Sequence, residues 1–348
     1  MLERLRQAQS ESGAIFDADS SVPVSFGNDA IALEAARSGV AVCDRSHWGR
    51  LQICDSDRQN FLHNQTTNDI KSLKPGQGCD TVFVTSTART LDLVTVYVLA
   101  DSLLVVVSPN RRQKLLQWCD RYIFFGDRVA VKDSTDQTAM FSLLGPRSTE
   151  VLGKLGLELP PEAVYGAHQS VSLGDGPVQV AIGSGLAVPG YTLITPVENA
   201  ATLWQLLVGA GATPLGEQVW EQLRIEQGRP MPDHELTEDY NPLEAGLWQS
   251  VSFNKGCYIG QETIARLDTY KGVKQRLLGL RLSVPVVPGT PVVLGEEKIG
   301  VVTSLHQNGS QPLGLAYIRT KAGGVGLQVE VDGHPAEVVE VPFLTHQQ

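Results

Sequence analysis

The sequence predicts a multidomain protein of the α+β class that ends in a small β domain. Its 348 residues exceed the size of about 250 to 300 residues at which a single hydrophobic core stops growing. Segments typical of strands and of helices follow one another in mixed order, which favours α+β layers over a regular β–α–β array. From about Val273 onward the pattern changes to short strands separated by turn residues.

The first part of the chain contains elements of both kinds. Three consecutive runs rich in β-branched residues indicate strands, and an apolar stripe at helical spacing places Cys119 on the buried face of a helix. The predicted helices lie at about 30–38, 56–62 and 110–124, and the predicted strands at 49–53, 82–85, 91–99 and 103–108.

The middle part continues this mixture. Strands are predicted at 138–144, near Val171, at 178–182 and at 191–195, with a short helix ending near Leu155 and a longer one at about 198–208. A further helix should start at Pro214, because proline suits the first helical turn, and end near Gly228. The polar interval 230–241 indicates a surface connection.

The C-terminal β domain is predicted from alternating apolar residues between turn residues. Its strands should lie at 276–282, 291–294, 299–305, 314–318, 326–331 and 336–341.

Composition excludes several classes of function. With 42% hydrophobic and 19% charged residues, the chain is typical of globular proteins rather than disordered or fibrous ones. The net charge of −10 argues against a nucleic acid partner, because phosphate-backbone binding needs clustered Lys and Arg. No Walker loop, dinucleotide fingerprint or nucleophile elbow is present, so the sequence does not indicate nucleotide chemistry.

We expect a cytoplasmic protein without a membrane partner. The N-terminus is polar with mixed charges, unlike an export signal, and no run of about 18 apolar residues occurs. The five cysteines form no CxxC pair, which favours reduced thiols in a reducing compartment, and the seven histidines show no metal-ligand spacing. We therefore expect no metal site held by this chain alone.

The run Asn254 to Glu262 is the most informative segment for function. It combines two glycines, one thiol and several polar groups, and Gly256 and Gly260 allow backbone conformations or close approaches that other residues do not. The run therefore predicts a shaped loop at a site.

Cys257 has several interpretations. Lys255, Arg266 and Lys271 could favour its thiolate electrostatically, and its glycine neighbours would leave it accessible. A single thiol cannot hold an iron–sulfur cluster, so a partner or a second copy would have to complete the site. It could instead act on a small-molecule ligand or on a sulfur species, or simply be a small buried residue that fills a tight loop.

Arg224 is the second candidate. It lies close in sequence to Glu226 and precedes Glu244 in the following turn. One interpretation is an arginine–carboxylate pair that ties the loop to the helix, and the other is a cation that binds an anionic or carbonyl group of a ligand. The two are compatible.

The segment Lys255, Gly256, Cys257, Tyr258, Gly260, Gln261 and Glu262 resembles the signature of folate-binding proteins of the YgfZ/Iba57 type, which assist the maturation of iron–sulfur enzymes and share the fold of glycine-cleavage T-protein. Further matches to the T-protein family run from about residue 25 to 340. They are Asp44 with Ser46 and Gly49, Thr67 to Asp69, Pro75 to Gln77, Asp92, Leu223 to Gly228, Pro242 to Leu247, and Gly300 to Ser304.

The resemblance implies a three-domain fold around a central funnel that holds tetrahydrofolate, with a ferredoxin-like unit and a C-terminal β-barrel. The implied divisions are a folate-binding region at 1–250, built from two α+β subdomains, the signature loop and its connection at 251–272, and the barrel at 273–348. Four residues match or accompany the folate-binding positions of the aminomethyltransferases: Asn68, Asp92, Asn110 and Arg224.

Asp92 is also the candidate catalytic residue beside Cys257. The family's matching aspartate lies next to the reacting folate nitrogens, and a carboxylate there can orient or deprotonate an amine. The alternative for Asp92 is a residue of an edge strand that faces water.

Two departures count against aminomethyl transfer. Val188 aligns with a family glutamate that grips the pterin, and a valine side chain cannot accept a hydrogen bond. Trp220 and Glu221 stand where the family has an Arg-Asp pair.

The leading hypothesis is therefore a tetrahydrofolate-binding accessory factor for assembly or repair of iron–sulfur proteins, with assembly factors or client proteins as partners. A tetrahydrofolate-dependent aminomethyl- or methyltransferase is the second hypothesis. A folate-binding scaffold in which Cys257 is inert is the third.

Overall fold

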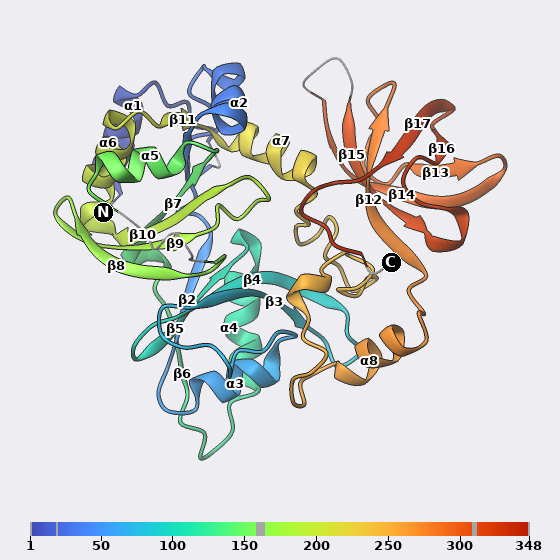
Figure 1. The fold of residues 1–348 in the computed structure, drawn as a ribbon, viewed down its shortest axis with the longest axis horizontal. Coiled ribbons are helices and arrows are strands. Elements are labelled where there is room, and N and C mark those ends of the chain that lie inside the picture. Colours follow the sequence, from blue (N-terminus) through green and yellow to red (C-terminus); the bar gives the residue numbers. More distant parts are fainter. Residues whose placement is uncertain (1, 19, 158–163, 308–311, 347–348) are drawn as a thin grey trace. The chain divides into compact units, whose positions relative to one another are not determined.

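The computed structural model describes residues 2–18, 20–157, 164–307 and 312–346, and its fold is α+β (Figure 1). The chain divides into two compact units that are both discontinuous in sequence. The first comprises Met1–Gln59, Ser72–Cys79 and Thr95–Trp220, and the second comprises Asn60–Lys71, Asp80–Val94 and Glu221–Gln348. The divisions at residues 250 and 272 that the resemblance implies stay a prediction.

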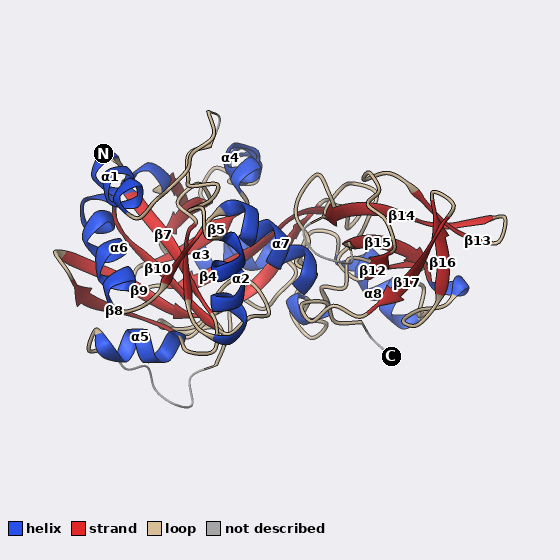
Figure 2. Cartoon of the chain, turned by 90° about the horizontal axis from the view of Figure 1, so that it is seen from above, coloured by secondary structure: helices blue, strands red, loops and turns tan. Residues whose placement is uncertain are grey.

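The first unit contains a six-stranded sheet in the order β11-β1-β7-β10-β9-β8. Its strands are β1 (Ala41–Asp44), β7 (Thr138–Leu144), β8 (His168–Leu173), β9 (Gly176–Ile182), β10 (Gly190–Pro196) and β11 (Thr213–Leu215). The helices of this unit are α1 (Glu3–Glu11), α2 (Asp29–Ser38), α5 (Ser148–Lys154) and α6 (Ala200–Gly209), and Figure 2 shows them as blue coils beside the red strands. Strand β1 pairs in parallel with β11 and antiparallel with β7.

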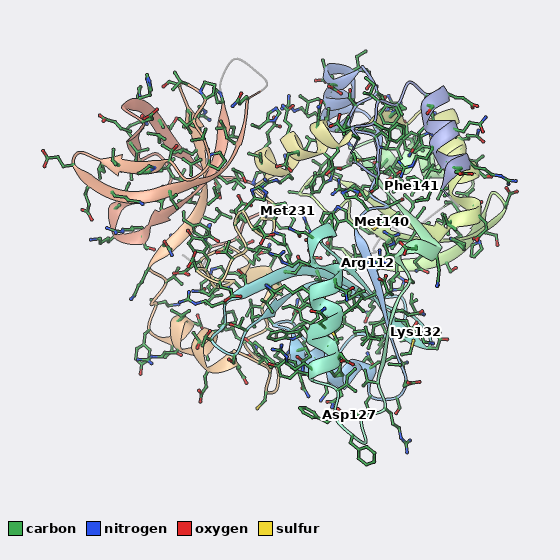
Figure 3. The ribbon with its side chains drawn as sticks, turned by 180° about the vertical axis from the view of Figure 1, so that it is seen from behind. Arg112, Asp127, Lys132, Met140, Phe141 and Met231 are labelled. Atoms are coloured by element: carbon green, nitrogen blue, oxygen red, sulfur yellow. The ribbon has the colours of Figure 1, made fainter. Side chains whose placement is uncertain are left out.

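Aromatic residues fill the core between this sheet and its helices. The ring of Trp204 on α6 stacks on Phe26 at a centroid distance of 5.5 Å and packs against Phe141 of β7, which Figure 3 labels. Gln9 of α1 is fully buried and its Nε2 donates to Asp44 Oδ2 at 2.7 Å. The N-terminal helix, which the sequence pattern did not predict, is thereby fixed to the start of the β1–β2 connection.

A five-stranded sheet has the order β3-β4-β5-β2-β6. Its strands are β2 (Gly49–Cys54), β3 (Gly78–Val84), β4 (Thr90–Val98), β5 (Ser102–Val107) and β6 (Ala130–Asp133), and the associated helices are α3 (Arg58–Gln65) and α4 (Arg112–Arg121). Every residue of β4 and β5 is buried, as their continuous apolar runs lead one to expect. Cys119 on α4 is 1% exposed, so its predicted place in the core is confirmed.

Six strands of the second unit form a closed barrel in the order β12-β15-β14-β13-β16-β17. They are β12 (Gln275–Leu282), β13 (Pro291–Leu294), β14 (Glu297–His306), β15 (Leu313–Arg319), β16 (Gln328–Val331) and β17 (His334–Val339). Gly300 is required where β14 pairs with β15, because a Cβ there would lie 2.3 Å from the carbonyl oxygen of Tyr317. The predicted C-terminal β domain is thus confirmed strand by strand.

The remaining helices of the second unit are α7 (Glu217–Gln227), which begins in the first unit, and α8 (Gln261–Thr269). Short 3-10 helices occur at Pro109–Arg111, Thr135–Gln137, Val197–Asn199, Trp248–Ser250 and Thr320–Ala322. Among the described residues, no helix is long and apolar enough to cross a membrane.

Two local predictions are wrong. Pro214 lies in the edge strand β11 instead of starting a helix, which is possible because an edge position leaves one side of the strand without hydrogen-bonding partners. The interval 230–241 is not a surface connection throughout, since Glu235 and Leu236 are 0% and 1% exposed. Glu235 is buried because it pairs with Arg224 of α7 and Ser304 of the barrel, whereas Asp233, His234, Glu238 and Asp239 are exposed.

Candidate functional site

The signature segment forms the loop before α8. Gly260 precedes the helix with a φ of +83°, and a Cβ there would lie 2.8 Å from the carbonyl oxygen of Thr85. This position therefore requires glycine. At Gly256, by contrast, the nearest atom to an added Cβ would be Nε2 of His63 at 3.8 Å, so the fold of the described residues leaves room for a side chain there.

Lys255 anchors this loop to the end of α3. Its side chain is 8% exposed, and its Nζ donates to the carbonyl oxygens of His63, Thr66 and Asn68 at 2.5, 2.6 and 2.7 Å. The ammonium group also lies 4.6 Å from the ring centroid of Tyr258, where a cation–π interaction is favourable. Because carbonyl groups at a helix C-terminus lack partners within the helix, a buried lysine there satisfies them and complements the helix dipole.

The backbone of the same loop also contacts α3. The N–H of Ile259 donates to the carbonyl oxygen of Asn64 at 3.0 Å. Side chain and main chain together hold the loop, so Lys255 is engaged in positioning it rather than standing free beside the thiol. The structure thus brings Asn68 and the signature segment into contact.

Cys257 is the one exposed cysteine among the described residues, whereas Cys43 and Cys119 are buried and Cys54 and Cys79 are half-buried. The interpretation of Cys257 as a small buried residue is therefore wrong. No cluster of three or more potential metal ligands occurs in the described part of the chain. Lys255 holds the segment while leaving the thiol accessible to solvent.

His63 is a neighbour that the sequence pattern did not single out. Its side chain is buried, and its Nδ1 lies 3.2 Å from Asp69 Oδ1. Burial, reinforced by the charge of Lys255, lowers the pKa of His63, although Asp69 opposes this shift. The imidazole of His63 thus lies between an anchoring cation and a carboxylate, beside Gly256. The sequence gives little indication of this contact, because His63 lies near the end of a short helix and about 190 residues before the signature segment.

Arg224 is 1% exposed and is held by protein groups on α7, on the following loop and on the barrel. Its Nε contacts both carboxylate oxygens of Glu221 at 2.9 Å, its Nη1 donates to Glu235 at 3.0 Å, and its Nη2 donates to Ser304 Oγ at 2.8 Å. The predicted tie between loop and helix exists, but its carboxylates are Glu221 and Glu235 rather than Glu226 or Glu244.

Glu235 is the centre of this network and was missed by the sequence analysis. It is fully buried, accepts a hydrogen bond from Ser304 Oγ at 2.6 Å, and its carbonyl oxygen accepts one from Tyr317 at 2.8 Å. A buried charge needs such compensation. The network explains why the apparently irregular interval 230–241 carries an acidic residue in the core.

The other predicted residues are distributed over both units. Asp92 lies on β4 and is 0% exposed, so the alternative of a side chain facing water is wrong. Asn68 donates from Nδ2 to the carbonyl oxygen of Asp80 at 2.8 Å, and its Oδ1 accepts from the N–H of Asp69. Asn110 is exposed at the turn after β5 and belongs to the first unit, whereas Asn68, Asp92 and Arg224 belong to the second.

The first unit contains a polar cluster that the sequence analysis also missed. The Arg45 guanidinium carbon lies 3.6 Å from the ring centroid of Trp220 and 4.9 Å from that of Trp48. Nη1 of Arg45 pairs with Glu217, and His47 Nε2 lies 3.7 Å from the same carboxylate. Burial alone would raise the pKa of Glu217, but Arg45 and His47 outweigh it and lower this pKa to about 2.

Some polar atoms of this cluster have no hydrogen-bonding partner among the described residues. They are Nη2 of Arg45, Nδ1 of His47 and Nε1 of Trp220.

The structure shows the surroundings of the two residues that were expected to depart from the T-protein pattern. Trp220 is covered by Arg45, and the main-chain oxygen of Val188 accepts a hydrogen bond from Ser184 at 2.6 Å.

Comparisons with known proteins agree with this architecture. The model of the GCVT N-terminal domain family matches residues 6–255. A chloroplastic protein of Arabidopsis thaliana that is named a transferase is 47% identical over 326 residues, which cover 93% of this chain and 76% of the relative. An aminomethyltransferase of Bacillus mycoides (strain KBAB4) is 30% identical over 337 residues, covering 92% and 91%.

Among solved structures, the aminomethyltransferase T of the glycine cleavage system from Bartonella henselae superposes with a TM-score of 0.86. The match covers 99% of this chain and 98% of the other at 21% identity, and it confirms the predicted T-protein-like fold with a C-terminal barrel. The chain therefore belongs to the GCVT N-terminal domain family, as the sequence motifs predicted.

Proposed function

We propose that this protein is a tetrahydrofolate-binding accessory factor for the assembly or repair of iron–sulfur proteins, of the YgfZ/Iba57 type. The observation that carries the proposal is the construction of the signature loop. The ammonium of Lys255 anchors the loop through three hydrogen bonds, while the thiol of Cys257 in the same loop is exposed. A segment built in this way supports a role for the thiol in contact with another molecule.

Cys257 would act together with a second protein. A cluster usually needs four ligands, and no set of three or more potential ligands occurs in the described part of the chain. The iron–sulfur cluster is cargo in this proposal, and the assembly factor or client protein supplies the other ligands. A cytoplasmic location of this exchange stays a prediction.

Tetrahydrofolate is the proposed ligand of the family fold. We propose Asp92 as the carboxylate near the reacting nitrogens and Asn68 and Asn110 as further folate-binding residues. Arg224 is already bonded to Glu221, Glu235 and Ser304, so its contribution would be to hold these groups in place. The unpartnered donors of Arg45 and Trp220 support a ligand contact different from that of the aminomethyltransferases.

Two measurements test the proposal. Calorimetric titration with a reduced folate should show binding that Asp92→Asn weakens. In cells that lack the gene, the wild-type chain should restore the activity of [4Fe–4S] enzymes under oxidative stress, and Cys257→Ser should not. Cys54→Ser is the matched control, because Cys54 is a thiol of the same chain outside the signature loop. Full restoration by Cys257→Ser would instead indicate a folate-binding scaffold with an inert thiol.

A tetrahydrofolate-dependent aminomethyl- or methyltransferase is the second candidate. The 30% identity to an aminomethyltransferase and the buried carboxylate of Asp92 favour it, whereas Val188 and Trp220 oppose it. An assay of methylene-tetrahydrofolate formation from one-carbon donors separates the two candidates. Robust turnover by the purified chain, lost in Asp92→Asn, would establish the transferase and refute the accessory role as the main activity.

A further inference from the structure

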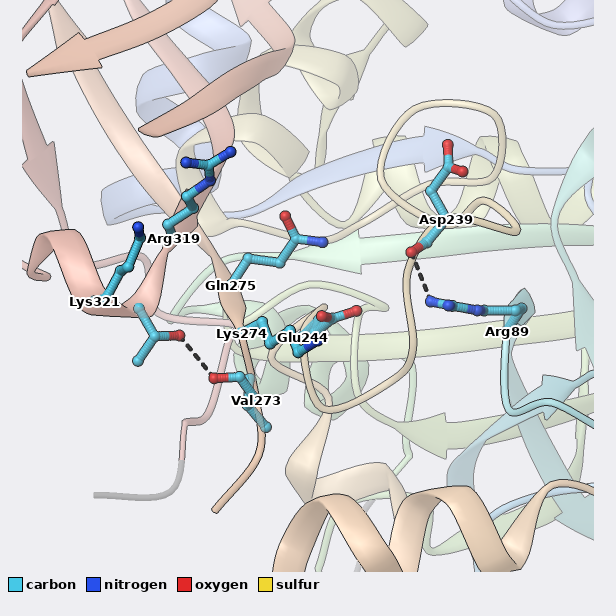
Figure 4. Close-up of a pocket in the computed structure, with 9 residues that line it drawn as sticks. Arg89, Asp239, Glu244, Val273, Lys274, Gln275, Arg319 and Lys321 are labelled. Atoms are coloured by element: carbon cyan, nitrogen blue, oxygen red, sulfur yellow. Dashed lines mark hydrogen bonds between the residues drawn. The ribbon is translucent and has the colours of Figure 1, made fainter. Parts of the chain in front are cut away.

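The second unit contains a cavity of about 720 Å³ that none of the residues discussed for folate lines. It lies between the turn before β4, the loop after α7, the start of β12 and the end of β15 (Figure 4). Small-molecule sites in proteins typically have volumes of about 300 to 1,000 Å³. The cavity is therefore large enough for an organic ligand and far larger than an inorganic ion needs.

Main-chain hydrogen bonds fix the walls of this cavity. The N–H of Thr320 donates to the carbonyl oxygen of Lys274 at 2.9 Å, and the N–H of Leu277 donates to that of Glu244 at 2.8 Å. Val273 of the lining packs against the small apolar cluster that contains Ala88, Leu243 and Tyr258 of the signature segment. The lining residues thus stand on a packed scaffold.

The lining is cationic although the chain as a whole is acidic. Four cations, Arg89, Lys274, Arg319 and Lys321, face two carboxylates, Asp239 and Glu244, in a chain whose net charge is −10. Figure 4 shows Arg89 on the opposite side of the view from Arg319 and Lys321. Positive charge is therefore presented from two sides, which suits a ligand with two anionic groups.

These cations are available to a ligand. The ammonium of Lys274 makes no hydrogen bond within the part of the chain that the structure describes, although its charge acts on Glu244, while Arg319 and Lys321 share one oxygen of the exposed Glu297 at 3.0 and 3.2 Å. Exposed ion pairs contribute at most about 1 kcal/mol, so a better acceptor can replace them. Arg89 uses Nη1 to donate to the carbonyl oxygen of Asp239 at 2.7 Å.

The two carboxylates restrict the class of anion. The four cations and two carboxylates of the lining leave a net charge of +2, which matches a ligand with two negative charges. A highly charged polyphosphate would be repelled by Asp239 and Glu244. Burial raises the pKa of Glu244 against the opposing charges of Arg89 and Lys274, so the two cations lie close enough to this carboxylate to act on it. Arginine and lysine both bind carboxylates well.

We propose that this cavity binds a small organic dicarboxylate through Arg89 on one side and Arg319 and Lys321 on the other, with Lys274 between them. The site is separate from the folate proposal and does not depend on it. Arg319 provides direct recognition of one carboxylate, and Lys274 supplies an ammonium that forms no hydrogen bond among the described residues.

The test is a nuclear magnetic resonance titration of the full chain with glutarate, with butyrate as the monocarboxylate and inorganic phosphate as the alternative anion. Glutarate should shift the resonances of residues 273–275 and 319–321 in a saturable manner, and butyrate and phosphate should bind much more weakly. Arg319→Gln should weaken glutarate binding about fivefold or more, since a charge-assisted hydrogen bond is lost. Lys274→Gln should weaken it in the same direction.

Arg281→Gln is the matched control. Arg281 is 46% exposed and pairs with Glu337, much as Arg319 is 47% exposed and pairs with Glu297, but Arg281 does not line the cavity. This variant should bind glutarate as the wild type does. The proposal is refuted if glutarate gives no saturable shifts at millimolar concentration, if Arg319→Gln and Arg281→Gln behave alike, or if phosphate binds as tightly as glutarate.

Discussion

The guanidinium of Arg45 covers the indole ring of Trp220, with 3.6 Å between the guanidinium carbon and the ring centroid. Trp220 lies on α7, whereas Arg45 directly follows β1, so the pair joins two segments that are far apart in the sequence. The pair is 2% exposed on both sides, and Glu217 compensates the charge. A cation and an indole from distant parts of the sequence thus pack as one buried pair.

Trp220→Arg should destabilise the protein. The change removes a buried indole and places a second cation against Arg45, which together should lower the free energy of unfolding by about 3 kcal/mol or more. Urea denaturation measures this loss. Trp118→Arg, at a half-buried position on α4, is the control and should cost clearly less. Equal stability of Trp220→Arg and wild type would contradict the role of the stacked pair.

Glu217 should make stability depend on pH in the acid range. Its pKa is about 2 in the folded protein and about 4.5 ordinarily, so its stabilising effect is complete above pH 4.5 and is lost as the pH falls toward 2. With allowance for partial solvent exposure, the loss should be about 2 kcal/mol. Denaturation curves at a series of pH values should show a shallower acid slope for Glu217→Gln. Arg45→Met should flatten the slope in the same way, and an unchanged slope in both variants would refute the assignment.

Lys255→Met should destabilise the second unit. The substitution keeps the length of the side chain but leaves three carbonyl groups without the ammonium that binds them, at a cost of about 3 kcal/mol. Hydrogen exchange should also accelerate at Ile259, whose N–H bond holds the same loop. Lys298→Met, on an exposed position of β14, should change stability by less than about 0.5 kcal/mol. Similar stability of the two variants would show that Lys255 does not anchor the loop.

The cysteines should differ strongly in reactivity toward iodoacetamide. Cys257 is exposed and should be alkylated first in the native protein, whereas Cys119 is buried and its pKa is raised by burial to about 12. Cys43, also buried with a raised pKa, should be protected in the same way. Mass spectrometry after a short pulse identifies the modified residue. The idea fails if Cys257→Ser does not remove the fast phase, or if Cys119 reacts as quickly as Cys257.

The barrel strands were predictable because their signal is local. Alternating apolar residues between turns identified all six strands, and the predicted bounds of β13 coincide with the observed ones. The prediction that a helix starts at Pro214 failed because the preference of proline for a first helical turn is local. The edge position of Pro214 in a sheet depends instead on pairing with β1. The pairing partner is more than 150 residues away, so no window around Pro214 contains it.

The sequence by itself determined the order of most elements, the all-β character of the C-terminal domain and the motifs that place the chain in its family. These features follow from periodicity and turn residues, which act between close neighbours in the chain. Only the tertiary structure decided which polar residues are engaged and which are free. Lys255 meets carbonyl groups nearly 200 positions earlier, Arg224 is enclosed by Glu235 and Ser304, and Cys257 is left exposed. The partner of a buried polar group is set by distant segments that pack beside it, and its own sequence neighbours do not specify them.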